Sequence, residues 1–251
     1  MPPLIKIALV TGAATGIGRA CAHALAEAGY IVALNYRSQL SAAERVLREL
    51  PGEGHGLFQA DVADATACQH LVDEVVERYG HLDLLVNAAG VFTHQAIVGD
   101  SQDDYNDWTD GWQQSLATNL IGPVNLAWLA ARTMQSRGCG KIINITSRGA
   151  FRGEPTAPAY GAAKSALNST SQSMAVALAP HGVHVYAIAP GWVNTPQASP
   201  RISEEMITGI PLGRVGHPEE IAALVRFLAT GDTAYLTGAI FDANGASYLR
   251  N

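Results

Sequence analysis

A tyrosine and a lysine four positions apart are the residues of this sequence best suited to acid–base chemistry. Tyr160 and Lys164 lie in the segment YGAAK, and a spacing of four places two side chains on one face of a helix, one turn apart. By chance, a chain with eight tyrosines and three lysines holds about 0.1 such pairs. An exposed polar helix pair is the alternative interpretation. Ser147, thirteen residues earlier at the end of a predicted strand, favours the catalytic one.

The chemistry that this pair predicts is proton transfer by a phenol. A tyrosine has an ordinary pKa near 10, so exchanging its proton near neutral pH requires a neighbouring cation that stabilises the phenolate. Lowering the pKa by about three units needs about 4 kcal/mol, which one unit charge supplies at about 4 Å and an effective dielectric of about 20. We therefore expect Lys164 to lower the pKa of Tyr160.

A glycine-rich segment indicates where a nucleotide would bind. Residues 11–18 read TGAATGIG and lie between a predicted strand and a predicted helix. Glycines there permit a tight turn and close backbone approach to a pyrophosphate, and the helix N-terminus attracts the anion. A purely structural turn is the alternative. Asp61-Val62 and the segment 87–90 follow two further predicted strands, and ligands of parallel sheets bind at the carboxyl ends of strands.

The elements that must position these residues alternate between strand and helix. Short runs rich in Ile, Val and Leu alternate with longer segments of helical periodicity. This alternation predicts a single α/β domain over 1–251, a doubly wound Rossmann-type parallel sheet with helices on both faces. The seven expected strands are 4–10, 31–36, 57–60, 82–87, 141–146, 183–189 and 240–242. The principal expected helices begin near residue 17 and near residues 41, 64, 113 and 158.

Composition excludes several classes of function. The chain has 251 residues and a net charge of −6, which disfavours binding to nucleic acid or to anionic lipid. Three cysteines without metal-ligand spacing, and histidines without an HExxH pattern, predict free thiols and no metal site. We find neither a secretory signal nor an apolar run long enough to span a membrane. A cytoplasmic protein is therefore expected.

Taken together, the motifs resemble those of the short-chain dehydrogenase/reductase family, in particular its compact one-domain branch, which includes the 3-oxoacyl-carrier-protein reductases. The match covers nearly the whole chain and keeps the family's motif order. The resemblance implies an oxidoreductase that moves a hydride between a nicotinamide cofactor and a carbonyl or secondary alcohol, and it implies a homotetramer. A non-catalytic dinucleotide-binding regulatory protein is the alternative.

The resemblance also assigns roles to residues. It implies that Tyr160 is the general acid/base, that Ser147 hydrogen-bonds the reacting oxygen, and that Lys164 also holds the nicotinamide ribose. Asn119 would help to position a proton-relay water. The residues expected to contact the cofactor are Gly12, Thr15, Gly16, Ile17, Gly18, Arg37, Asp61, Val62, Asn87, Ala88, Ala89, Gly90, Tyr160, Lys164, Pro190, Gly191, Val193 and Thr195.

The residues after the second strand bear on the choice of cofactor. The segment 35–38 reads NYRS and has no acidic residue of the kind that binds ribose hydroxyls in NAD-preferring relatives. Arg37 can pair with a 2′-phosphate, so NADP(H) is the expected cofactor, with a solvated surface arginine as the alternative. Thr15 stands where many phosphate-preferring relatives have a basic residue, which leaves use of NAD(H) open.

Two segments fall outside the family pattern. Residues 190–217 contain four prolines and four glycines, and the part from about 195 to 212 is expected to close over the substrate as a lid. The segment from about 94 to 111 is longer than usual for the reductases and is expected to be a solvated excursion. Its acidic residues are Asp100, Asp103, Asp104, Asp107 and Asp110. Arg148 and Arg152, just after Ser147, could meet an acidic substrate or could be solvated loop residues.

Overall fold

The fold is built on one parallel sheet of seven strands. The computed structural model describes residues 5–97 and 104–250, and the sheet order is β3-β2-β1-β4-β5-β6-β7. The strands are β1 (Lys6–Val10), β2 (Tyr30–Tyr36), β3 (Gly56–Gln59), β4 (Leu84–Asn87), β5 (Gly140–Ile145), β6 (Val183–Pro190) and β7 (Ile240–Ala243). All seven predicted strands are found, and the predicted doubly wound parallel α/β fold is confirmed.

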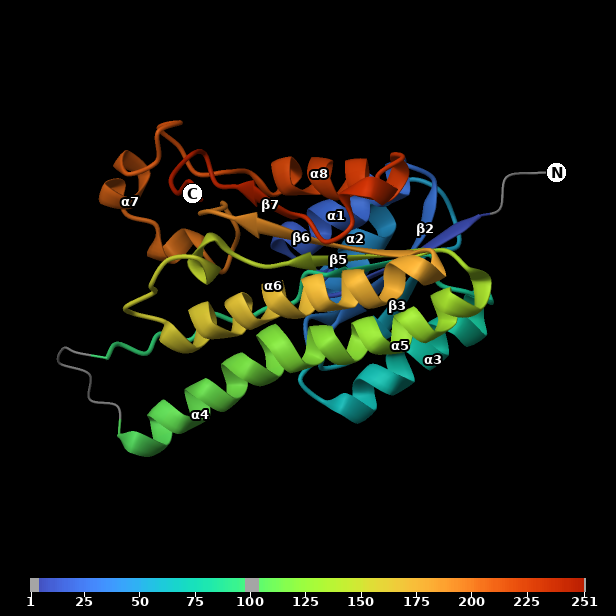
Figure 1. Ribbon diagram of the computed structural model, residues 1–251, viewed down its shortest axis with the longest axis horizontal. Coiled ribbons are helices and arrows are strands. Elements are labelled where there is room, and N and C mark those ends of the chain that lie inside the picture. Colours follow the sequence, from blue (N-terminus) through green and yellow to red (C-terminus); the bar gives the residue numbers. More distant parts are fainter. Residues whose placement is uncertain (1–4, 98–103, 251) are drawn as a thin grey trace.

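Helices cover both faces of this sheet (Figure 1). The α-helices are α1 (Gly16–Glu27), α2 (Leu40–Glu49), α3 (Ala65–Tyr79), α4 (Tyr105–Leu116), α5 (Gly122–Arg137), α6 (Pro158–Leu178), α7 (Glu204–Thr208) and α8 (Pro218–Thr230). One buried cluster joins the sheet to α1, α2 and α8, and a second joins its other face to α3, α5 and α6. Both faces of the central strands are therefore buried, as their continuous apolar sequences require.

The order of the strands creates a crevice at one edge of the sheet. The chain runs outward from β1 through β2 to β3, then returns to β4 on the other side of β1. At such a reversal, the loops after the two neighbouring strands diverge and leave room for a ligand. The loop after β1 is the glycine-rich segment, and the loop after β4 contains Gly90. The fold thus brings together two of the predicted binding segments.

Helix α3 shows how local sequence sets the bounds of an element. Asp64 accepts hydrogen bonds from the backbone amides of Thr66 and Ala67, at 2.7 and 3.0 Å, and so caps the N-terminus. Gly80 ends the helix with φ of 82°, a left-handed conformation that glycine adopts without strain. The start of this helix near residue 64 was predicted, and that prediction is confirmed.

The helix before β5 begins earlier than its periodicity indicated. We expected it near residue 113, but α4 begins at Tyr105 and continues through a π-helical turn, Ala117–Ile121, into α5. Asp104 caps α4 by accepting from the amides of Asn106 and Asp107, and the carboxylate of Asp107 accepts in return from the amide of Asp104. This capping box is a start signal that the sequence interpretation overlooked.

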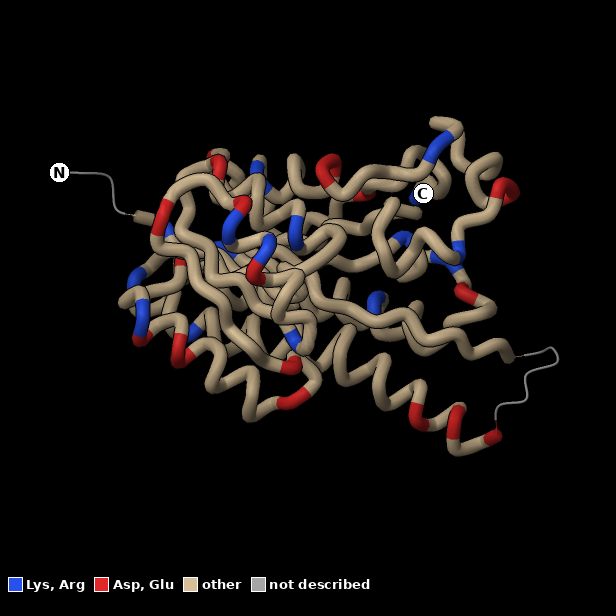
Figure 2. The backbone as a smooth tube through the Cα atoms, turned by 180° about the vertical axis from the view of Figure 1, so that it is seen from behind, with Lys and Arg blue, Asp and Glu red and all other residues tan. Residues whose placement is uncertain are grey.

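The acidic residues are therefore partly helical rather than an irregular excursion. Asp104, Asp107 and Asp110 lie at the first turns of α4, where negative charge is favourable next to the helix N-terminus. All three are exposed, and Figure 2 shows acidic positions, drawn in red, at the start of this helix. Backbone hydrogen bonds from Asp107 and Asn106 lower the pKa of Asp104. Asp100 and Asp103 lie outside the described residues.

The predicted lid contains two short helical turns. A 3₁₀ turn, Ser199–Arg201, and helix α7 follow Thr195, and Ser203 caps α7 by accepting from the amide of Met206. Figure 1 places α7 at the end of the molecule toward which the strands point. Within the ranges that the structure describes, no helix has both the length and the hydropathy needed to cross a membrane.

Candidate active site

A cavity of about 260 Å³ lies at the crevice between the loops after β1 and β4. It is lined by the N-terminus of α1 and by the ends of β2, β3 and β4. Most of the predicted cofactor residues line it, namely Gly12, Thr15, Gly16, Ile17, Gly18, Arg37, Asp61, Val62, Ala88, Ala89, Gly90 and Thr195. We call this space the nucleotide cavity. Its lining shows that the fold collects into one place segments predicted separately from the sequence.

The three glycines of the loop after β1 are required by its geometry. A Cβ atom on Gly18 would lie 2.3 Å from the carbonyl oxygen of Gly12, and one on Gly12 would lie 2.9 Å from Cα of Ala89. Gly12 and Gly16 also have φ of 62° and 55°, in the left-handed region. Only glycine allows this close passage of the loop over β4, and it leaves the backbone of the helix N-terminus open to an anion. The loop therefore fits the pyrophosphate of a dinucleotide.

Two side chains that the sequence interpretation did not select hold this loop in place. The hydroxyl of Thr11 accepts from the amides of Ala88 and Ala89, each at 3.0 Å, and so ties β1 to the loop after β4. The amide group of Asn35 donates to the carbonyls of Phe58 and Ala60, at 3.3 and 3.1 Å. Both are buried polar residues at strand ends, and that placement was the available signal.

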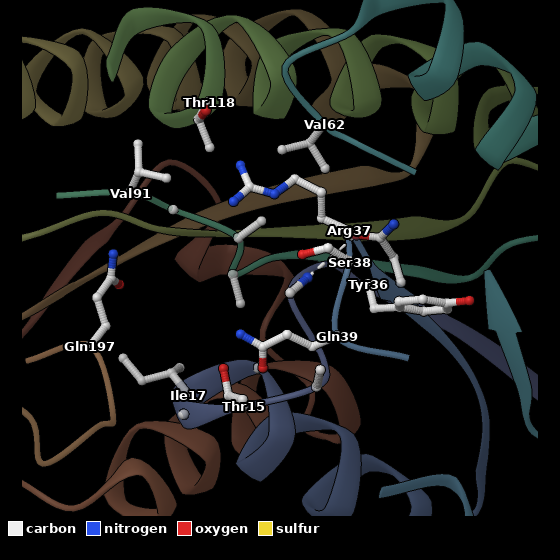
Figure 3. Close-up of a pocket in the computed structure, with 18 of the residues that line it drawn as sticks. Thr15, Ile17, Tyr36, Arg37, Ser38, Gln39, Val62, Val91, Thr118 and Gln197 are labelled. Atoms are coloured by element: carbon white, nitrogen blue, oxygen red, sulfur yellow. Dashed lines mark hydrogen bonds between the residues drawn. The ribbon is translucent and has the colours of Figure 1, made fainter. Parts of the chain in front are cut away.

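Arg37 reaches into the nucleotide cavity from the end of β2. Figure 3 shows its side chain extending toward Val91 and Thr118, whereas the ring of Tyr36 points away. Its guanidinium lies 4.0 Å from the carboxylate of Asp61, and both side chains are largely exposed. A pair this long and this exposed contributes little free energy. The guanidinium therefore remains able to bind an anionic ligand.

A second cavity, of about 160 Å³, adjoins the first. The side chains of Ser147, Tyr160 and Lys164 line it, together with Pro190, Gly191 and Val193. Ile17, Ala88, Gly90, Val91, Thr195 and Gln197 line both cavities. We call the second space the catalytic cavity. Its shared wall places the phenol and the ammonium at the mouth of the glycine-rich loop, where a reacting ring of the cofactor and a substrate could meet.

Lys164 and Asn119 meet close to Gly90. A Cβ atom on Gly90 would lie 3.0 Å from Oδ1 of Asn119 and 3.7 Å from Nζ of Lys164. Asn119 is fully buried in the π-helical turn, accepts from the amide of Val91 at 3.1 Å and donates to its carbonyl at 2.9 Å. It does not itself line either cavity. Both groups therefore lie beside the backbone of Gly90, where a side chain would crowd them.

The pKa of the Tyr160 phenol is raised, whereas the sequence led us to expect a lowered pKa. Lys164 donates to the carbonyl of Ile145 at 2.9 Å, and its Nζ lies 5.8 Å from the centre of the Tyr160 ring. Burial raises the pKa of Tyr160, and the hydrogen bond with Ser147 only partly opposes that effect. Burial also lowers the pKa of Lys164, to about 8. Lys164 is not among the groups that lower the pKa of Tyr160, so the expected effect of the lysine is not found, and both groups are withdrawn from water.

Asn87 was predicted to contact the cofactor, but its side chain forms buried hydrogen bonds within the protein. Its amide nitrogen donates to the carbonyl of Pro123 at 3.1 Å and to Oδ1 of Asn144 at 2.8 Å. Asn144 donates in turn to the hydroxyl of Ser171 at 2.8 Å. This buried network joins β4, β5 and α6 and fixes the helix that carries Tyr160. Asn87 lines neither cavity.

The catalytic cavity includes Phe92, Glu154 and Arg201, which were not predicted to belong to the site, and Arg148, which the sequence left undecided. Phe92, Arg148, Glu154 and Arg201 line it, from the loop after β4, the segment after β5 and the predicted lid. The rings of Phe92 and Tyr160 lie 5.1 Å apart. Arg148 is buried, and its guanidinium donates to the hydroxyl of Ser247, whereas Arg152 is exposed and does not line the cavity. The sequence left the two arginines undecided, and the structure separates them.

This chain is similar to known reductases over nearly its whole length. Residues 12–245 match the family described as Enoyl-(Acyl carrier protein) reductase. The 3-oxoacyl-[acyl-carrier-protein] reductase FabG of Staphylococcus aureus is 38% identical over 251 residues, covering 98% of this chain and 99% of the relative. The 3-oxoacyl-[acyl-carrier-protein] reductase of Synechocystis is 36% identical and covers 97% of both chains.

Solved structures agree in fold. Acetoin dehydrogenase YohF from Salmonella typhimurium superposes with a TM-score of 0.87 at 33% identity, over 99% of both chains. The acetoin dehydrogenase from Enterobacter cloacae also gives a TM-score of 0.87 at 33% identity, over 99% of this chain and 98% of the other. The sequence and structural matches therefore extend over essentially the whole chain.

Proposed function

This chain belongs to the short-chain dehydrogenase/reductase family and is an NAD(P)-dependent oxidoreductase, and from that premise we propose that it interconverts a carbonyl and a secondary alcohol with Tyr160 as general acid/base. The observation that carries the proposal is the shared wall of the two cavities, which joins the glycine-rich loop to Ser147, Tyr160 and Lys164. A non-catalytic dinucleotide-binding protein is not favoured, since it needs none of these three side chains.

The residues of the two cavities have different roles in the proposed reaction. The bound nicotinamide cofactor supplies the hydride. The amides of the glycine-rich loop and the start of α1 would hold its pyrophosphate, and Lys164 its ribose. Ser147 would hydrogen-bond the reacting oxygen beside Tyr160. Since burial raises the pKa of Tyr160, the phenol is protonated at neutral pH and can donate its proton to a carbonyl oxygen.

Carbonyl chemistry is favoured over other reductions by the named relatives. The two curated relatives quoted above are 3-oxoacyl reductases, and the solved structures include acetoin dehydrogenases. We extend carbonyl reduction to this chain as a class, with the segment 195–212 closing over the substrate. The three unpaired cysteines support a reducing compartment, the cytoplasm.

We expect NADP(H) to be preferred because Arg37 can bind a 2′-phosphate in the nucleotide cavity. Replacing it, Arg37→Ala, removes a charge-assisted contact and is expected to lower kcat/KM for NADPH by about 10-fold or more. The value for NADH should change by less than about threefold, since NADH has no phosphate at that position. Steady-state kinetics with both cofactors measure the effect.

The matched control is Arg48→Ala. Arg48 is exposed on α2, and the same charge is removed without touching the cavity. Its kcat/KM should stay within about twofold of wild type for both cofactors. Equal losses with NADPH and NADH in the Arg37 variant, or a wild-type preference for NADH, would contradict the assignment of Arg37.

We also propose a homotetramer. Large apolar side chains remain exposed on three helices of the single chain, namely Trp128 on α5, Val176 on α6 and Phe227 on α8. Apolar groups on a helix face are stabilised by burial against a second copy. Light scattering during size exclusion should give a mass four times that of one chain. A monomer at micromolar concentration would contradict the proposal.

A further inference from the structure

The guanidinium of Arg201 is the feature of the catalytic cavity that the chemistry of Tyr160 does not use. Arg201 ends the 3₁₀ turn of the segment 195–212 and lines the cavity across from the phenol. Among the described residues, no carboxylate lies within 4.0 Å of it. The Nε of Arg201 is buried, and it donates no hydrogen bond to any residue that the structure describes. A buried donor on a cation without an acceptor is costly.

The guanidinium of Arg201 packs against the ring of Phe92. The guanidinium lies 4.0 Å from the centre of the Phe92 ring, and the Phe92 ring lies 5.1 Å from the ring of Tyr160. Stacking on an aromatic face orients a guanidinium plane while leaving its edge free for an anion. The ring of Phe92 therefore contacts both the guanidinium of Arg201 and the ring of Tyr160. The positive charge of Arg201 acts to lower the pKa of Tyr160, and Tyr160 acts to raise the pKa of Arg201, although burial outweighs both effects.

The remaining charges of the cavity leave it positive. Arg148 is buried and donates to the hydroxyl of Ser247, and Glu154 is the single carboxyl in the wall of the cavity as the structure describes it. Burial raises the pKa of Glu154, while Arg152 and Arg148 act against that effect. Apart from Lys164, two guanidiniums therefore face one carboxyl group. Such a cavity favours a ligand that carries negative charge.

We propose that Arg201 binds the carboxylate of the substrate, which is a short oxo acid in the reducing direction and the corresponding hydroxy acid in the oxidising direction. The proposal rests on the proposed carbonyl–alcohol chemistry and names its substrate class. The cavity of about 160 Å³ also adjoins residues of the glycine-rich loop and Thr195, where the reacting ring of the cofactor would lie. The space left for the substrate therefore fits a small molecule. The carboxylate would bridge the edge of the guanidinium while the carbonyl lies against Ser147 and Tyr160.

The test compares acids with their methyl esters. The probes are 2-oxobutanoate, 3-oxobutanoate and 4-oxopentanoate, each paired with its uncharged methyl ester, so that the spacing of carbonyl and carboxylate is varied. Binding is measured by NADPH fluorescence in the Tyr160→Phe protein, which is expected to turn the probes over about 10³-fold more slowly than the wild type, and kcat/KM is measured in the wild type. We expect at least one acid to bind about 30-fold more tightly than its ester.

The decisive variant is Arg201→Gln, which keeps the chain as far as Cδ and a polar end group but removes the positive charge. It should weaken binding of that acid, and lower its kcat/KM, by about 30-fold, with changes of less than about threefold for the ester. Arg152→Gln is the matched control, because it removes an exposed positive charge outside the cavity wall. It should change acid binding by less than about threefold.

The outcomes separate this inference from the proposed function. If every ester binds as tightly as its acid, or if Arg201→Gln weakens both equally, the carboxylate site is disproved while carbonyl reduction still stands. If the wild type turns over no carbonyl but acids bind in an Arg201-dependent manner, the proposed reaction fails and the anion site remains. If acid binding depends on Arg152 as strongly as on Arg201, the assignment to Arg201 is overturned.

Discussion

Tyr160→Phe is expected to lower kcat by about 10³-fold while the Kd for NADPH stays within about threefold of wild type. The substitution removes one hydroxyl from the catalytic cavity and keeps the ring that packs against Phe92. Since the general acid is lost and the stacking is not, the effect should fall on the chemical step. Single-turnover absorbance of the nicotinamide measures that step, and fluorescence titration measures binding.

The control for this experiment is Tyr79→Phe. The hydroxyl of Tyr79 donates to the carbonyl of Gly54 at 3.0 Å, far from both cavities. Losing one neutral hydrogen bond of this kind costs about 1 kcal/mol of stability and should leave kcat unchanged. A Tyr160→Phe protein that retains more than a tenth of wild-type turnover would show that the proton passes through another group.

Lys164→Met is expected to lower kcat by about 100-fold or more and, at the same time, to stabilise the cofactor-free protein. The lysine is almost completely buried, and within the described residues it has no carboxylate partner and one acceptor, the carbonyl of Ile145. Removing the ammonium takes away the positive charge beside Tyr160 and the group assigned to the ribose. Kinetics with saturating cofactor separate the loss of turnover from the loss of binding.

The gain in stability has a defined pH dependence. Burial lowers the pKa of Lys164 from 10.5 to about 8, so below pH 8 the folded state carries the full cost of the buried charge. Between pH 8 and 10.5 the unfolded chain binds more protons at this site than the folded chain, so the cost disappears as the pH rises. The variant should therefore be more stable by about 1–3 kcal/mol at pH 7.

Urea unfolding of the wild type and Lys164→Met at several pH values tests this prediction. The other titrating groups are common to both proteins, so the difference between the two free energies isolates Lys164. That difference should shrink toward zero as the pH rises from 8 to 10.5. A variant that is less stable than the wild type at pH 7 would show that the ammonium is stabilised by contacts that outweigh its burial.

Lys164 and Arg201 show why the cavity departs from the rules that stabilise a core. Lys164 is buried, Arg201 has a buried Nε, and neither side chain has a carboxylate partner among the described residues. Buried charges of this kind destabilise a fold and persist where a ligand or a reaction uses them. In the proposed enzyme, the cofactor ribose and the substrate carboxylate are the groups that complete them.

The sequence alone determined the seven strands, the parallel sheet and the family. Continuous apolar strands and glycine-limited helices are local patterns, so their periodicity predicts the elements directly. Ser147 was expected at one rim of the sheet because parallel strands end at the same edge, and Tyr160 and Lys164 lie beside it on the first turns of α6. The start of α4 was also encoded locally, in the pair Asp104 and Asp107, but its capping box was overlooked.

Only the tertiary structure decided which charges meet in the cavity. Phe92, Glu154 and Arg201 come from three segments without a shared motif, and they meet because those segments follow the neighbouring strands β4, β5 and β6 at one edge of the sheet. The pKa of Tyr160 likewise depends on burial and on side chains distant in sequence, so the four-residue spacing to Lys164 could not reveal its direction. Periodicity reports what neighbours along the chain share, whereas desolvation and charge depend on which chain segments fold against one another.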